Sequence, residues 1–220
     1  MNYTIITVGK THSWKTTFWK RFLENIPDSI TFDSDVLSDF FVTTYPWLGQ
    51  AKILPVSDPQ EQETIATDML HVLKKYYPWD RDDSFFFEDQ QHVKSRKVLH
   101  AVSRLYLLES AFSTEHPVIL TSAHVSKKAR AIVKQMSDKA KRQFIIIYFN
   151  YSEEFLLERI KRSDRNKGIL VDSKTFENLL LHKQRDIFEP PTPDEADLFF
   201  EITNDESLEQ TKQKILSLLT

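Results

Sequence analysis

The feature that most constrains the fold is the N-terminal stretch YTIITVG, residues 3–9, with the residues that follow it. A short run rich in β-branched residues that ends in glycine is typical of a buried strand. From Lys15 onward, Phe18, Phe22 and Ile26 recur at helical spacing. Only three glycines occur among the 220 residues, so a glycine at the end of this strand is informative. The chain is therefore predicted to begin with a strand, a tight loop and a helix.

The loop reads GKTHSWKT over residues 9–16, and it matches the pattern G-x-x-x-x-G-K-[ST] everywhere except at Trp14. In such a loop, backbone N–H groups surround a phosphate, the lysine adds a positive charge, and the last hydroxyl reaches Mg²⁺. The candidate binding residues are Gly9, Lys10, Thr11, His12, Ser13, Trp14, Lys15, Thr16 and Thr17. The alternative interpretation is an ordinary turn followed by the start of a capped helix.

Trp14 stands where the pattern has its second glycine. If that position needs a positive φ, a non-glycine residue costs about 1–2 kcal/mol. We expect the indole ring to be turned away from the phosphates. Replacement of Trp14 by glycine is then expected to increase nucleotide affinity.

The remaining chain alternates short apolar runs with amphipathic runs, which predicts a doubly wound parallel sheet. Further strands are predicted within 29–37, 117–122, 143–150 and 197–202, and helices within 92–113, 126–140, 152–165, 172–188 and 206–219. We therefore expect one three-layer α/β domain spanning residues 1–220, with about five parallel strands. Residues 40–91 show a weaker pattern and are expected to form a helical insertion.

Composition excludes several classes of protein. The chain has no cysteine, so disulfides and cysteine-based metal sites or nucleophiles are excluded. Its net charge of −3 argues against binding to an extended nucleic-acid duplex. No apolar run approaches the roughly 20 residues that span a bilayer, so no membrane association is expected. A cytoplasmic protein is the expectation.

Four segments together resemble the P-loop kinases of the polynucleotide-kinase-like and zeta-toxin-like branch, an AAA-type predicted kinase family. They are the loop at 9–17, the acidic turn FDSDVL, the segment VILTSAHVSKKAR, and the pair LLERIKRSDR and FEPPTPDEADLFFEI. The resemblance implies a P-loop NTPase fold and transfer of the γ-phosphate of ATP, with Mg²⁺, to a hydroxyl. The acceptor would be a nucleic-acid end, a nucleotide or a small molecule, and the bound nucleotide ATP or GTP.

The resemblance also implies roles for particular residues. Lys15 and Asp35 would be catalytic, with Asp35 as the general base on the acceptor hydroxyl. Thr16 and Asp33 would hold the metal ion. The alternative is that the two aspartates cap a helix that begins near Val36.

Three positions depart from the family pattern. Ser38 replaces an arginine, Thr121 replaces an aspartate, and His124 replaces an asparagine. Together with Trp14, these departures keep open a second interpretation, a nucleotide-binding protein with weak or no kinase activity.

A lid is expected over residues 156–175. Arg159 and Arg162 would be its catalytic arginines, and Arg165 would contact the nucleotide. A solvated basic helix face is the alternative. In the insertion, the aromatic residues would either stack on an acceptor or form a small hydrophobic subdomain. These residues are Tyr45, Trp47, Tyr76, Tyr77, Trp79 and Phe85 to Phe87.

Overall fold

The computed structural model describes residues 2–26, 28–32, 107–163, 176–177 and 179–219, with the single positions 60, 64, 67 and 71. Only the backbone is described at Thr16, Lys20, Arg21, Leu179 and Lys183. The chain forms two compact units, residues 1–33 with 114–220, and residues 34–113. Most of the predicted insertion at 40–91 lies outside the described residues, so the single-domain organisation stays a prediction.

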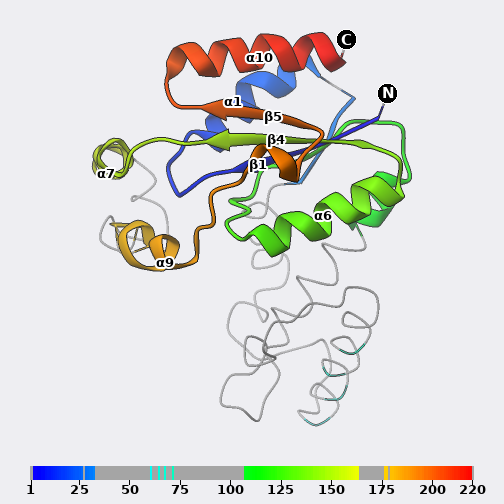
Figure 1. The fold of residues 1–220 in the computed structure, drawn as a ribbon, viewed down its shortest axis with the longest axis horizontal. Helices are drawn as coiled ribbons and strands as arrows, with labels where there is room; N and C mark the ends of the chain where they lie inside the picture. The colour runs from blue at the N-terminus through cyan, green and yellow to red at the C-terminus, as the bar shows by residue number, and fades with distance from the viewer. Residues whose placement is uncertain are drawn as a thin grey trace. The chain divides into compact units, whose positions relative to one another are not determined.

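The first unit contains a five-stranded parallel sheet in the order β2-β3-β1-β4-β5 (Figure 1). The strands are β1 (Tyr3–Val8), β2 (Ile30–Phe32), β3 (Val118–Leu120), β4 (Gln143–Phe149) and β5 (Leu198–Ile202). The α/β fold and the five parallel strands predicted from the sequence are confirmed. β4 is almost wholly apolar because both of its faces are covered, as in most parallel sheets.

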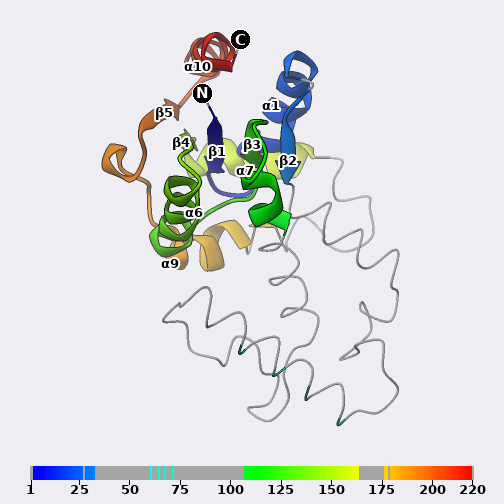
Figure 2. The same cartoon turned by 90° about the vertical axis from the view of Figure 1, so that its right-hand side faces the viewer.

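Helices cover the two faces of this sheet, and the perpendicular view of Figure 2 shows the same layers. On one face lie α1 (Lys15–Phe22), the short 3₁₀ turn η1 (Leu23–Asn25) and α10 (Asp205–Leu219); α6 (Lys127–Lys139) lies on the other. Ser126 caps α6 through the Ala129 N–H, as its position before the helix predicts. Within the described part of the chain, no helix has the length and apolar character needed to cross a membrane.

The other helical elements lie beyond the carboxyl end of the sheet or lead back to it. They are α7 (Glu153–Arg162), the π-helical segment η4 (Leu179–Gln184), α9 (Arg185–Ile187) and the 3₁₀ turn η5 (Pro193–Glu195). Residues 107–112 are also helical, within the predicted helix at 92–113. Ser152 caps α7 by accepting a hydrogen bond from the Phe155 N–H.

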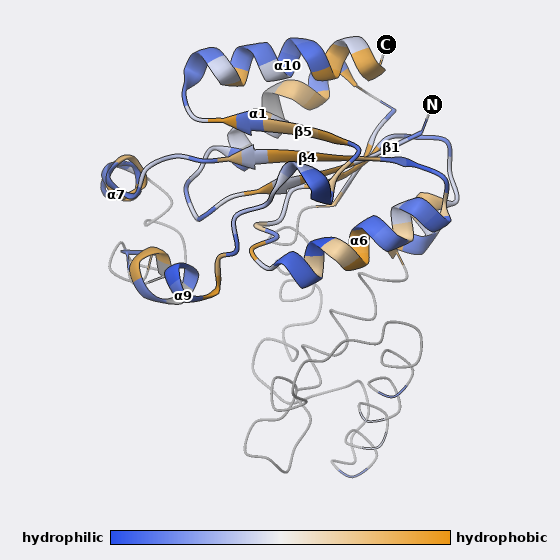
Figure 3. Cartoon of the chain, viewed as in Figure 1, coloured by the Kyte–Doolittle hydropathy of each residue, from blue (hydrophilic) through white to orange (hydrophobic). Residues whose placement is uncertain are grey.

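The core lies between the sheet and the α1–α10 layer. Ile5, Ile145 and Ile147 are fully buried, and Phe18 stacks with Phe22 on α1 at a ring distance of 5.3 Å. Figure 3 shows the strands as the most apolar part of the described chain, with polar residues on the outer helix surfaces. The parallel register brings the carboxyl ends of β1, β3 and β4 to one edge, where the candidate site lies.

Candidate functional site

The loop from Gly9 to Trp14 leaves the carboxyl end of β1, between β3 and β4. Chain connections diverge on the two sides of β1, and ligands of open α/β sheets bind outside the strands at such a point. A Cβ atom at Gly9 would lie 2.7 Å from Ser13 Oγ and 3.0 Å from Phe149 Cβ. Glycine is therefore needed at position 9 because the loop passes close to β4, and not for a positive φ.

Two non-glycine residues of the loop have left-handed backbone conformations. His12 has a φ of 59° and Trp14 a φ of 68°. Each such residue costs on the order of 1–3 kcal/mol and persists only where the surrounding structure imposes the conformation. The sequence-based concern about Trp14 thus has a geometric basis, since this position does use the conformation that favours glycine.

Trp14 is also the N-cap of α1, but in the described structure no side chain caps this helix end. The first N–H groups of an α-helix have no partner within the helix. Together with the helix dipole, they favour an anion at this end.

Lys15 folds back over the loop. Its Nζ atom donates to Gly9 O at 2.9 Å, to Lys10 O at 2.6 Å and to Ser13 Oγ at 2.9 Å. Ser13 is buried and Lys15 half-buried. The lysine charge is therefore held against the backbone of the loop, next to the start of α1.

The loop is contacted from outside by two elements that are distant in sequence. Lys10 Nζ lies 2.7 Å from Glu153 Oε1 at the start of α7, and Glu153 Oε2 accepts from Arg185 at 2.5 Å. Hydrogen bonds from Arg185 and Lys10 lower the pKa of Glu153 from 4.5 to about 2. The Thr11 N–H donates to Gln184 Oε1 at 2.7 Å. Glu153 and the segment at 184–185 thus hold the first half of the loop.

The Trp14 ring contacts α7. The Arg159 guanidinium carbon lies 4.0 Å from the ring centroid, and the ring also packs against the hydrophobic core. Burial lowers the pKa of Arg159, but a guanidinium remains charged at neutral pH. This stacking was not predicted from the sequence, and it compensates part of the backbone strain at position 14.

Arg162 has a different environment. Its side chain is 81% exposed and pairs with Glu158 of the same helix at 3.1 Å. The structure therefore brings Arg159 to the loop but not Arg162, whose catalytic role stays a prediction. Of the predicted lid, residues 156–163 are described, and Arg165 lies outside the described residues.

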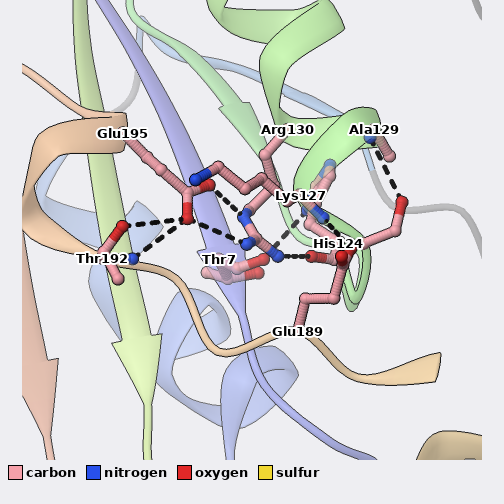
Figure 4. Close-up of polar contacts among 9 residues, drawn as sticks. Thr7, His124, Lys127, Ala129, Arg130, Glu189, Thr192 and Glu195 are labelled. Atoms are coloured by element: carbon pink, nitrogen blue, oxygen red, sulfur yellow. Dashed lines mark hydrogen bonds and ion pairs between the residues drawn. The ribbon is translucent and has the colours of Figure 1, made fainter. Parts of the chain in front are cut away.

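A buried polar network supports the edge of the sheet beside the loop (Figure 4). His124 Nδ1 lies 2.9 Å from Thr7 O, and Arg130 donates to His124 O at 3.0 Å. Arg130 also pairs with Glu195 at 2.8 Å, and these side chains are 0% and 8% exposed. Although burial alone would raise it, hydrogen bonds from Arg130 and the Thr192 N–H hold the pKa of Glu195 below its usual range.

This network joins two of the segments on which the family resemblance rests. Arg130 ends VILTSAHVSKKAR, and Glu195 lies in FEPPTPDEADLFFEI. Their contact holds η5 against α6, and the Lys127 N–H adds a hydrogen bond to Glu189 at 2.6 Å. These motif residues therefore have a structural role that spacing alone does not reveal.

The predicted metal and base residues lie mostly outside the described part of the chain. Asp33, Asp35 and Ser38 lie outside the described residues, as does the side chain of Thr16. Thr121 donates to Phe32 O at 3.3 Å, which uses its hydroxyl proton within the sheet. No group of three or more His, Asp or Glu side chains within the described ranges is arranged to hold a metal ion. The metal site at Thr16 and Asp33 stays a prediction.

Three residues at the loop were missed by sequence reasoning: Glu153, Gln184 and Arg185. Glu153 follows the capping residue Ser152, a position typical of an ordinary helix start. Gln184 and Arg185 belong to an amphipathic run in which polar residues usually face solvent. Only burial distinguishes Gln184, which is 7% exposed, and no sequence pattern signals it.

The residues around the loop fit a phosphate-bearing ligand. Trp14 Nε1 and Arg159 Nη1 are buried, and neither has a hydrogen-bond partner among the described residues. Both groups are donors only, and the N–H groups at the start of α1 and the Lys15 ammonium, which now donates to the loop, are donors as well. Such a set of donors suits an anionic ligand rich in acceptor oxygens.

A parallel sheet in this order, with a lysine-bearing loop between β1 and α1, is the fold of the P-loop kinases. The chain is similar to Kti12 from Chaetomium thermophilum, solved with ADP-AlF3, at 13% identity, 99% coverage of both chains and a TM-score of 0.52. A candidate kinase from Chloroflexus aurantiacus is 16% identical, with coverage of 99% and 96% and a TM-score of 0.53. No family model and no curated protein sequence matches the chain.

Proposed function

We propose that the protein is an ATP-dependent phosphotransferase of the polynucleotide-kinase-like and zeta-toxin-like branch. It would move the γ-phosphate to a hydroxyl of a nucleic-acid end, a nucleotide or a small molecule. One observation carries the proposal: Lys15 Nζ lies within 2.9 Å of Gly9 O, Lys10 O and Ser13 Oγ, beside a helix start that no side chain of the described residues caps. The Chaetomium neighbour, which was solved with ADP-AlF3, supports a nucleotide as the ligand.

The chemistry assigned to the chain follows from these positions. Lys15 and the first N–H groups of α1 would bind the phosphates of ATP or GTP, and Arg159 would add a positive charge nearby. Asp35 would accept the proton of the acceptor hydroxyl. The oxygen of that hydroxyl would bond to the γ-phosphorus while the bond between the γ-phosphorus and the nucleoside diphosphate breaks. Thr16 and Asp33 would hold Mg²⁺, which neutralises phosphate charge when bound.

The first test is nucleotide binding. We expect Lys15→Ala to weaken binding of Mg-ATP and Mg-GTP by at least tenfold, because the variant loses the positive charge that directly follows the N-cap residue of α1. The exposed Lys139→Ala on α6 serves as a charge-matched control. Equal affinities for the wild-type protein and Lys15→Ala, measured by calorimetry, would remove the basis of the proposal.

The second test is phosphoryl transfer. Labelled γ-phosphate is followed onto nucleosides, oligonucleotide ends, sugars and aminoglycosides. With the acceptor found, Asp35→Asn should lower kcat far more than it changes nucleotide affinity, because a general base acts in the transition state. Equal effects of Asp33→Asn and Asp35→Asn would indicate a shared metal role instead.

A nucleotide-binding protein with weak or no kinase activity is the second candidate. It is favoured by Thr121 and His124, since one hydroxyl donates to Phe32 O and the imidazole contacts Thr7 O. These groups serve the sheet edge where the resembling family has aspartate and asparagine. Tight nucleotide binding with no transfer to any acceptor class would favour this second function.

A further inference from the structure

The phosphate loop of this chain has an energetic problem that glycine-rich loops do not have. Gly9 is its only glycine, and it does not have a positive φ. His12 and Trp14 both have left-handed backbones at φ values of 59° and 68°. A loop with two such residues keeps one path only if surrounding contacts impose it. The contacts that do so are therefore part of the binding site.

Those contacts come from α7 and from residues 176–185. Trp14 stacks on Arg159, and His12 meets the edge of the Phe176 ring at a centroid distance of 4.7 Å. Two further contacts are polar: Lys10 with Glu153, and the Thr11 N–H with Gln184. Gln184 holds a backbone group in the middle of the loop with its side chain. At the start of the loop, the Gly9 N–H donates to the backbone oxygen of Ala123 at 3.2 Å.

Gln184 is buried, and its backbone is held by neighbouring contacts. Its side chain is 7% exposed, so its amide oxygen has little access to competing water. It ends the π-helical segment η4, and π-turns are frequent at functional sites. The Gln184 backbone carbonyl accepts from the Phe188 N–H at 2.8 Å, and the neighbouring Arg185 pairs with Glu153. These two contacts hold the backbone at residues 184 and 185 in place.

We propose that Gln184 is a positioning residue of the phosphate loop: its amide oxygen holds the Thr11 N–H and keeps the loop in its anion-binding path. This inference rests on the proposed function, because it assigns Gln184 to the same site. The opposite role, in which a phosphate must displace the Gln184 amide, predicts tighter binding when the amide is removed. The two roles therefore differ in the sign of one measurement.

The test uses Gln184→Met, which keeps side-chain length and burial but loses the amide oxygen. The probes are Mg-ADP, Mg-ATP and sodium pyrophosphate, the last of which engages the loop without a base. We expect affinities for all three to fall by about fivefold to tenfold, the effect of one lost hydrogen bond in a preorganised site. The exposed His182→Ala on the same segment is the matched control and should bind as the wild-type protein does.

A second variant separates positioning from packing. Gln184→Glu can still accept from the Thr11 N–H, but it adds a negative charge beside the phosphates. We expect it to retain slow hydrogen exchange of the Thr11 amide while weakening anion binding. Gln184→Met should lose that protection. A purely structural role would lower the melting temperature without changing exchange at Thr11 selectively.

Tighter or unchanged anion binding in Gln184→Met would overturn the inference, and so would an unchanged exchange rate at Thr11. Failure of the proposed function is distinguishable, since it appears as an absence of Mg-ATP and Mg-GTP binding in the wild-type protein. The exchange measurement needs no nucleotide and still tests Gln184 in that case.

Discussion

The contact between Trp14 and Arg159 leads to a quantitative prediction about Trp14→Gly. Glycine relieves the left-handed strain at position 14, a gain of about 1–2 kcal/mol. The variant loses a partly desolvated cation–π contact at 4.0 Å, worth about 2 kcal/mol. It also loses burial of the half-buried ring against the core, worth roughly 2–3 kcal/mol. We therefore expect the free energy of unfolding to fall by about 2–4 kcal/mol.

The assay is a double-mutant cycle in urea, with Trp14→Gly, Arg159→Ala and the double variant. Because the two side chains touch, the cycle should give a coupling energy of about 1–2 kcal/mol. Nucleotide affinity should fall in Trp14→Gly, because Arg159 is no longer held beside the loop. The sequence alone suggested an increase, because that expectation included the strain but not the stacking, and the affinity of Trp14→Gly decides between the two predictions. Additive effects within about 0.3 kcal/mol, or tighter nucleotide binding, would refute the reasoning.

Two further predictions concern stability. Arg130→Ala leaves the carboxylate of Glu195 buried without its cation, so unfolding free energy should fall by about 3–5 kcal/mol in urea titrations; a loss under 1 kcal/mol would contradict this. The pKa of Glu153 is lowered to about 2, so its stabilising effect is complete above its ordinary pKa and is lost as pH falls through about 2. Glu153→Gln should therefore be less stable than the wild-type protein by about 1 kcal/mol at pH 7. The difference in melting temperature between the wild-type protein and Glu153→Gln should narrow from about pH 5 downward. A difference that stays constant with pH would exclude the ionised Glu153 carboxylate as the cause.

Local patterns in the sequence were sufficient for the strands, several helix starts and the loop itself. β1 and β4 were predicted as apolar runs, and both are buried strands. A helix was predicted within 126–140, and Ser126 caps it by accepting a hydrogen bond from the Ala129 N–H. These features depend on residues within a few positions of each other. Spacing alone also predicted the loop between the first strand and the first helix, and the binding of a phosphate by Gly9 and Lys15 stays a prediction.

The partners of that loop were decided by tertiary structure. Gln184 lies 173 positions from Thr11, and Glu195 lies 65 positions from Arg130. An amphipathic sequence pattern does not show whether a particular glutamine in it is buried or exposed to solvent. Likewise, the ring of Trp14 could not be placed before the position of α7 was known. Helical periodicity shows which face of an element is apolar, but which polar groups meet across the sheet edge depends on how complete elements pack.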